Sequence, residues 1–327
     1  LSGNDASFNN INLLGYLRGN DVSFNIISSE LSQIGWSDTI SDPLVMYELG
    51  EVTESHSSGL SSHDFNHPIC ALNDAGDILV RRVATGASDF TPLNRALAYK
   101  YDGNKWNQLG GEFQHGSTQN IPQFGGIHDL DINGTGDRVV FGHTYNESKN
   151  QRGMVQIYKL VNGDWENFVA WNNSSGTIFG SYLVPGSTAN STQGEDLGKK
   201  VAMNNAGDVV AFSAPKWGSS STLYNVGRIY VYYWNGTSWT ESADYIKGDK
   251  ANCKLGDWNT ELAMNKEGTR VLCSSMNAWA SSPNGTKRGI KIYEWSGTDF
   301  TSGSWVEKAA LYETSTLSGI QSGRGLA

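Results

Sequence analysis

The chain of 327 residues lacks the features that several broad classes of protein require. No run of residues approaches the ~18 consecutive apolar residues of a membrane-spanning helix, so we expect no membrane insertion. Basic residues are scarce, with 24 Lys and Arg against 33 Asp and Glu and a net charge of −9. Because no basic stripe is available to contact phosphates, nucleic acid is not an expected partner.

Cysteine and helical periodicity are also sparse. Three cysteines are too few for a disulfide framework. Cys70 and Cys273 lie in apolar, strand-like runs and are predicted to be buried thiols, whereas Cys253 lies in a loop and could pair with either. No segment sustains the 3.6-residue spacing of apolar residues, so helices should be few. The 38 Gly, 11 Trp and many uncharged polar residues are typical of β-rich extracellular or virion-surface proteins.

A fourfold internal repeat indicates the fold. In each copy a short apolar stretch precedes an Asn-x-x-Gly turn, an apolar run, a polar loop, an alternating stretch and a hairpin that ends at Trp. The turn glycines are Gly76, Gly136, Gly207 and Gly268, and the tryptophans are Trp106, Trp165, Trp239 and Trp305. Each unit therefore reads as four strands, A to D, in which Gly supplies a positive φ and Asn bonds its own backbone.

Four-stranded units of this length cannot protect their own edges, and radial repetition solves that problem. We therefore predict an all-β protein, a β-propeller of four-stranded blades with about four to five blades visible. The blades are expected near residues 65–112, 127–171, 197–245 and 255–313, with a partial next blade at 319–327. Residues 36–327 would form the propeller repeats, and 36–64 could supply outer strands of a preceding blade.

The repeat resembles the FG-GAP repeats of integrin α-subunit propellers and their microbial and viral relatives. Leu197–Gly198 and Ser213–Pro215 in the third copy match that pattern best, with Leu255–Gly256 in the fourth, while the first two copies lack the Ala-Pro element. The resemblance implies a ring that usually has seven blades, so we expect the chain to be part of a longer protein. It is specific for the fold and permissive for function.

The first 35 residues follow another pattern. Gly3–Asn9 returns as Gly19–Asn25, a period of 16 residues. The tandem resembles shaft repeats of fibrous surface proteins, including structural proteins of large algal viruses. We predict a short β-rich stalk over residues 1–35, which would be stabilised by oligomerisation or by docking onto another surface; the alternative is an N-terminal linker.

One loop in the second repeat has the oxygen side chains of a calcium site. Asp129, Asp131, Asn133 and Asp137 alternate along the segment, and Thr135 can contribute its carbonyl. Hard oxygen ligands on a loop that folds back on itself are what Ca²⁺ requires. FG-GAP repeats carry calcium loops at the same place, between strands A and B. The alternative is a hydrogen-bonded acidic turn, because the other repeats keep the Asn but not the two preceding Asp residues.

The long polar loops between strands B and C and between D and A should share one face of the propeller, opposite the short turns. Long loops on a rigid scaffold commonly carry recognition. Aromatic side chains among them could stack on sugars or contact a protein, namely Trp217, Trp258, Trp279, Tyr182 and Tyr224. The alternative is that the tryptophans fill gaps under their own loops.

Catalytic patterns are weak by comparison. The six histidines show no metal-ligand spacing, and the Ser-rich stretches lack a nucleophile elbow. Glu195, Asp196 and Asp257 precede strands A and could pair as carboxylates in a glycan-active hydrolase. We expect instead a non-enzymatic structural or adhesion module that binds a protein or glycan partner at a cell or particle surface.

Overall fold

The structure is a computed structural model that describes residues 69–83, 95–113, 127–143, 153–168, 196–218, 224–257, 260–277, 279 and 288–312. All of these belong to one compact unit of the chain, Val52–Leu326. The predicted stalk, residues 36–64 and the predicted partial blade at 319–327 lie outside the described residues.

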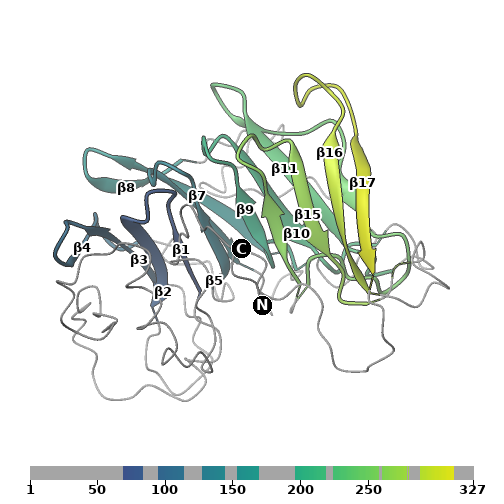
Figure 1. Ribbon diagram of the computed structural model, residues 1–327, viewed down its shortest axis with the longest axis horizontal. Helices are drawn as coiled ribbons and strands as arrows, with labels where there is room; N and C mark the ends of the chain where they lie inside the picture. Colours follow the sequence, from purple (N-terminus) through teal and green to yellow (C-terminus); the bar gives the residue numbers. More distant parts are fainter. Residues whose placement is uncertain are drawn as a thin grey trace, which may run out of the picture. The chain divides into compact units, whose positions relative to one another are not determined.

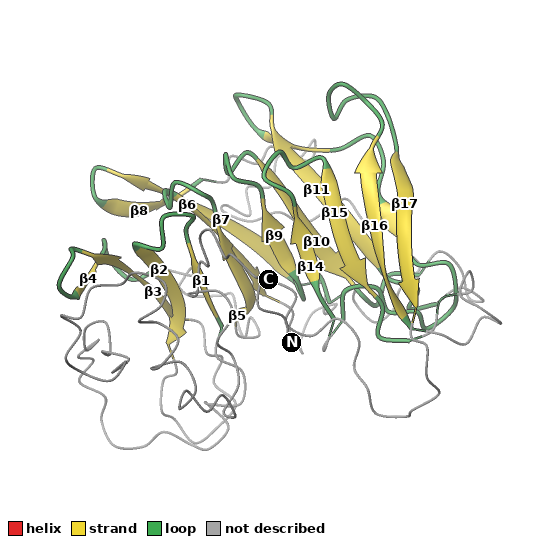
Figure 2. Cartoon of the chain, in the orientation of Figure 1, coloured by secondary structure: helices red, strands yellow, loops and turns green. Residues whose placement is uncertain are grey.

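Within the described residues, seventeen strands form four antiparallel sheets in chain order (Figures 1 and 2). The first sheet contains β1 (Cys70–Leu72), β2 (Ile78–Val83), β3 (Arg95–Tyr101) and β4 (Trp106–Gln108). The second contains β5 (Ile127–Ile132), β6 (Arg138–His143), β7 (Met154–Val161) and β8 (Asp164–Asn167). The third contains β9 (Val201–Met203), β10 (Val209–Ala214), β11 (Arg228–Trp234), β12 (Trp239–Glu241) and β13 (Ile246–Lys247). The fourth contains β14 (Leu262–Met264), β15 (Arg270–Ser274), β16 (Gly289–Trp295) and β17 (Trp305–Tyr312).

Each sheet is a propeller blade. The first strands of successive sheets are neighbours, with β1 beside β5, β5 beside β9 and β9 beside β14 (Figure 1). One apolar cluster fills the space between each pair of successive sheets. The prediction of an all-β protein with four-stranded propeller blades is therefore confirmed. The described residues contain no helix, and hence none of the length and apolar character needed to cross a membrane.

The Asn-x-x-Gly turns have nearly the same structure in all four blades. In the third blade, Asn204 Oδ1 accepts hydrogen bonds from the backbone N–H groups of Asp208 and Val209, at 2.9 Å each. The N–H of Gly207, whose φ is +70°, donates to the carbonyl of Asn204. The Asn side chain thus supplies the hydrogen-bond acceptor inside the turn, and glycine occupies the position that needs a left-handed backbone conformation.

These turns also bond to one another from blade to blade. The N–H of Asp74 donates to the carbonyl of Gly134, that of Gly134 to Asn205, and that of Asn205 to Lys266, at 3.0 to 3.2 Å. The residue after the turn Asn therefore forms a backbone hydrogen-bond chain across all four described blades. It satisfies backbone polar groups of the turns, which lie just beyond the ends of the first strands.

The Leu-Gly elements lock successive blades together. Leu197 is buried in the cluster between the second and third blades. Gly198, with φ +79°, donates its N–H to Ser213 of its own blade and lies against the second blade. A Cβ at Gly198 would lie 2.6 Å from the carbonyl oxygen of Met154, so only glycine fits here.

The fourth blade repeats this arrangement against the third. Leu255 is fully buried, and the N–H of Gly256 donates to the carbonyl of Ser274 at 3.1 Å. The hydroxyl of Ser213 donates to the carbonyl of Gly256 at 2.7 Å. The Leu-Gly and Ser-Ala-Pro elements of the sequence therefore meet at one blade interface, because the segment that begins the fourth blade contacts the end of β10 in the third.

The fourth blade has one face that no described blade covers. Ile290 and Ile292 on β16 are half-buried, whereas the matching Ile229 and Val231 on β11 are fully buried against the fourth blade. The equivalent residues are thus covered in the third blade, which the fourth blade follows, and only partly covered in the fourth blade, which no described blade follows.

The blade interface can be tested with two glycine substitutions. Gly198→Ala and Gly163→Ala both place a Cβ on a left-handed residue, which costs about 1 kcal/mol. Only the Cβ added at position 198 would clash with neighbouring atoms, since a Cβ at Gly163 would have no other atom within 4 Å. We expect Gly198→Ala to lower the free energy of unfolding by about 2 kcal/mol more than Gly163→Ala in urea titrations. Equal losses would contradict the interlocking interface.

Candidate functional site

The two acidic residues of the predicted calcium loop lie at the interface between the second and third blades. Asp129 Oδ2 accepts a hydrogen bond from the N–H of Val201 at 3.0 Å, and Asp131 Oδ2 accepts one from Met203 at 2.8 Å. Both donors belong to β9, the edge strand of the third blade. The carboxylates thus satisfy backbone groups that β10 does not pair.

The remaining predicted ligands close the turn on itself. Asn133 Nδ2 donates to Asp137 Oδ1 at 2.8 Å, and the Thr135 hydroxyl donates to the same oxygen at 2.6 Å. Within the described residues, no group of three or more His, Cys, Asp or Glu side chains gathers as a metal site would need. The five predicted ligands therefore divide between the interface and the turn, and calcium binding here stays a prediction.

Burial changes the ionisation of the interface pair. Loss of water raises the pKa of Asp129 to about 6 and that of Asp131 to about 7, although backbone hydrogen bonds oppose the change. Binding of Ca²⁺ requires ionised carboxylates, so it would have to displace protons from this pair near neutral pH.

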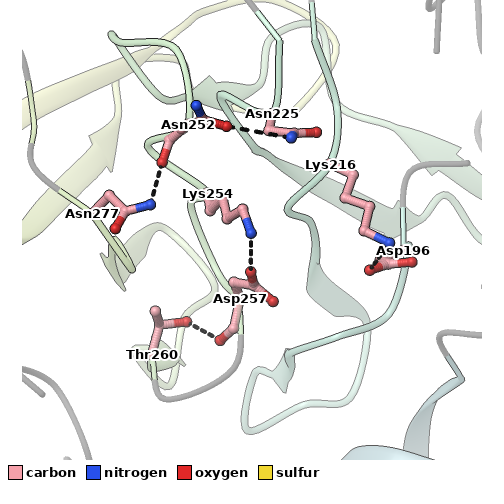
Figure 3. Close-up of polar contacts among 8 residues, drawn as sticks. All are labelled: Asp196, Lys216, Asn225, Asn252, Lys254, Asp257, Thr260 and Asn277. Atoms are coloured by element: carbon pink, nitrogen blue, oxygen red, sulfur yellow. Dashed lines mark hydrogen bonds and ion pairs between the residues drawn. The ribbon is translucent and has the colours of Figure 1, made fainter. Parts of the chain in front are cut away.

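The opposite end of the third and fourth blades carries a polar network that we call the loop cluster (Figure 3). Its side chains come from segments before β9, β11 and β14 and after β10 and β15. The loop cluster consists of Asp196, Lys199, Lys216, Tyr224, Asn225, Asn252, Lys254, Asp257, Thr260 and Asn277. This end corresponds to the predicted face of long loops, most of which lie outside the described residues.

Charged groups form the base of the loop cluster. Lys216 Nζ lies 3.0 Å from Asp196 Oδ2, and Lys254 Nζ lies 3.7 Å from Asp257 Oδ2 (Figure 3). Lys199 is only 5% exposed, and the charges of both acids and both lysines act on its ammonium group. Burial lowers the pKa of Lys199 to about 8; the two acids oppose this change and the two lysines add to it.

Amides and left-handed backbone shape the rim. Asn277 Nδ2 donates to the carbonyl of Asn252 at 2.7 Å, and Asn252 Nδ2 donates to the Tyr224 hydroxyl at 3.1 Å. Asp196, Asn225, Asn252 and Lys254 have φ between 50° and 60°. Of these, Lys254 carries the greatest strain, since Asn and Asp tolerate this region better than other residues with a Cβ. Strained residues persist where the surroundings fix them, and they concentrate at functional sites.

The predicted aromatic residues divide between the interior and the surface. Trp217 is 8% exposed and Trp279 is fully buried, where its Nε1 donates to the carbonyl of Gly289 at 3.2 Å. Neither ring offers a face to a ligand in this structure, so the described contacts fit the alternative of gap filling. Tyr224 is 50% exposed and belongs to the loop cluster. Trp258 and Tyr182 lie outside the described residues.

Sequence reasoning identified Asp196 and Asp257 but missed the lysines and amides around them. A usable signal was present in the sequence, because an Asp adjoins the Leu-Gly element in both repeats, before Leu197 and after Gly256.

His128 is also near this network. Burial, together with Lys199, Arg82 and Lys200, lowers the pKa of His128 to about 3, so its imidazole is neutral at physiological pH.

Comparisons with known proteins identify no family. No protein-family model and no curated protein matches the sequence. Among solved structures, a TolB protein from Agrobacterium tumefaciens is similar with a TM-score of 0.35 and 9% sequence identity. The match covers 74% of this chain and 62% of that one, so the chain spans less than two thirds of the TolB chain. A likeness at this level adds nothing to the assignment of function.

The role of Asp131 can be separated from calcium binding. Asp131→Ala removes the acceptor of the buried Met203 and Ile132 N–H groups, so the free energy of unfolding should fall by about 1–3 kcal/mol in EDTA. Asp131→Asn keeps one acceptor oxygen and should lose less. Equal stability of all three proteins in EDTA would contradict the hydrogen-bonding role.

Calorimetric titration of Ca²⁺ into the metal-free protein tests calcium binding itself. Binding heat in the native protein that is absent in Asp131→Ala would support a calcium site at this loop, and no heat in the native protein would reject it.

The buried ammonium of Lys199 should make stability depend on alkaline pH. Its folded pKa of about 8 lies below the ordinary value of 10.5, so between these values the unfolded chain binds more protons. The free energy of unfolding of the native protein, relative to Lys199→Met, should therefore rise by about 1–3 kcal/mol from pH 7.5 to 10. Urea titrations at both pH values measure this difference. A constant difference would show that Lys199 titrates normally.

Proposed function

We propose that this chain is a non-enzymatic structural or adhesion module that binds a protein or glycan partner through the loop cluster. The observation that carries the proposal is the gathering of an exposed phenol, amides and ion pairs around four residues whose backbone is held in left-handed conformations. Such a surface is preorganised by the blades beneath it, so binding would cost little ordering of its side chains.

The ion pairs support binding over glycan hydrolysis. A hydrolase of the paired-carboxylate type needs one carboxyl group to donate a proton. Asp196 and Asp257 each have a lysine ammonium nearby, at 3.0 and 3.7 Å. Each carboxylate is thus engaged by a lysine of its own loop face rather than directed at a substrate oxygen, as a general acid must be.

Several finer parts of the proposal rest on sequence patterns. The FG-GAP relationship is supported by the Leu-Gly elements, because Gly198 and Gly256 each lie at the start of a blade against its predecessor. The repeats over 1–35 would form a stalk that permits oligomerisation, and a calcium ion at Asp129–Asp137 would stiffen the second blade. Together these features fit an extracellular or virion-surface protein.

Replacement of Tyr224 tests the proposal most directly. The native protein and Tyr224→Ala are screened side by side against a glycan array and against surface proteins of candidate host cells. We expect at least one ligand whose binding Tyr224→Ala weakens about tenfold, because the half-exposed ring would bury its area against the partner.

Two further variants control this experiment. Leu311→Ala removes an exposed apolar side chain from β17, outside the loop cluster, and should leave binding unchanged. Tyr224→Phe removes only the hydroxyl that accepts from Asn252, so it separates the ring from its hydrogen bond. The proposal would be abandoned if no ligand depends on Tyr224, or if Leu311→Ala has the same effect.

A further inference from the structure

All three interfaces between successive described blades repeat one contact at their turn end. The fifth residue after each turn Asn packs against the turn glycine of the next blade. The pairs are Ile78 with Gly136, Arg138 with Gly207 and Val209 with Gly268, and a Cβ on each glycine would lie 2.6 to 2.8 Å from its partner's side chain. Nη1 of Arg138 also donates to the carbonyl of Gly207 at 2.9 Å. The contact accepts different residue types, so it belongs to the way in which successive blades stack.

The fourth blade carries the same groups on the side that no described blade covers. The N–H of Lys266 would be the next donor in the backbone chain that joins the turns, and it donates to no described residue. Arg270 is the fifth residue after the turn Asn, and its side chain is 60% exposed. Beside these residues, Ile290 and Ile292 are half-buried. We call Lys266, Arg270, Ile290 and Ile292 the trailing face, because they correspond to residues that meet a following blade elsewhere.

The first blade is open at the complementary positions. A Cβ at Gly76 would have no described atom within 4 Å, whereas the other three turn glycines each meet the preceding blade. Leu72 precedes the turn Asn and is 51% exposed, whereas Met203, at the same position of the third blade, is 6% exposed. Farther from the turn, Leu97 and Tyr99 are buried, so the open part of this side lies around the turn. We call Leu72, Asp74 and Gly76 the leading face.

We infer that the trailing face of one copy of this chain binds the leading face of a second copy. Arg270 would pack against Gly76 of the second copy, as the equivalent arginine of the second blade packs against its turn glycine. The N–H of Lys266 would donate to the carbonyl of Asp74 there and extend the backbone chain. A second copy is the partner that the structure favours, because one chain carries both halves of a contact that it already makes three times internally.

Burial of apolar side chains would supply most of the attraction. Leu72 on the leading face and Ile290 and Ile292 on the trailing face would lose their exposed area on contact. Two different surfaces meet in this contact, so it is heterologous and builds rings or filaments of copies. The inference goes beyond the proposed function, because the two faces belong to the first and fourth blades and not to the loop cluster.

Sedimentation velocity of the full chain from about 1 to 100 µM tests the inference. We expect the weight-average mass of the native protein to rise with concentration. Arg270→Glu should weaken association about tenfold or more, because it removes a charge-assisted hydrogen bond to the partner's backbone. Gly76→Ala should weaken association similarly, because its Cβ takes the place that Arg270 would fill.

Each variant has a matched control outside both faces. Gly163→Ala also places a Cβ on a left-handed glycine, in the hairpin between β7 and β8, where it meets no neighbouring atom. Lys247→Glu makes the same change in net charge as Arg270→Glu, at an exposed position of β13. Both control proteins should associate like the native protein.

A mixture of Arg270→Glu and Gly76→Ala distinguishes a head-to-tail contact from a symmetric one. Arg270→Glu keeps the leading face and Gly76→Ala keeps the trailing face, so the mixture should form a dimer and nothing larger. A native protein that stays monomeric over the whole range would show that another occupant covers the trailing face, and would overturn the inference. Association that neither variant weakens, or a mixture that forms no dimer, would overturn it as well.

Discussion

The unpaired edge of each blade's first strand is the constraint on which the rest of this structure depends. β1, β5, β9 and β14 pair with their own sheets on one side only, so their outward backbone groups must find partners in a neighbouring blade. Asp129 and Asp131 of the second blade meet this need for β9 by accepting from two of its N–H groups. The turns that follow the first strands are joined in addition by the chain of backbone hydrogen bonds from Asp74 through Gly134 and Asn205 to Lys266. Where no described blade follows, the Ile290 and Ile292 face of the fourth blade stays half-exposed.

The two ends of the blades consequently differ in how successive blades contact each other. At one end, short Asn-x-x-Gly turns bond to one another from blade to blade. At the other end, Leu-Gly elements interlock successive blades, and Gly198 and Gly256 bring the preceding loops into close contact. The loop cluster is built on this interlocked base. Its backbone strain can persist because buried apolar clusters on both sides of the third blade hold the loop ends in place.

Electrostatics distinguishes the interface acids from the loop cluster. Asp129 and Asp131 are buried beside backbone donors, so burial raises the pKa of each. In the loop cluster, burial lowers the pKa of Lys199. Buried ion pairs are weak contributors to stability, because desolvation offsets most of the attraction. The role in recognition that we propose for the loop cluster gives a reason for their retention on this face.

The sequence alone determined the blades, because local chemistry specifies them. Asn133 with Gly136, and the alternation along Arg228–Trp234, define turns and strands whatever the rest of the chain does. The same reasoning could not assign Asp131, since its partner Met203 is 72 residues away. It left two roles open for Trp279, ligand contact or gap filling, and only the structure places the ring against Lys291, with the ammonium 4.2 Å from the ring centre. Nor did it gather Lys216 and Lys254 into one cluster. Contacts between blades decide these features, because only tertiary structure sets which distant side chains share a buried, low-dielectric space.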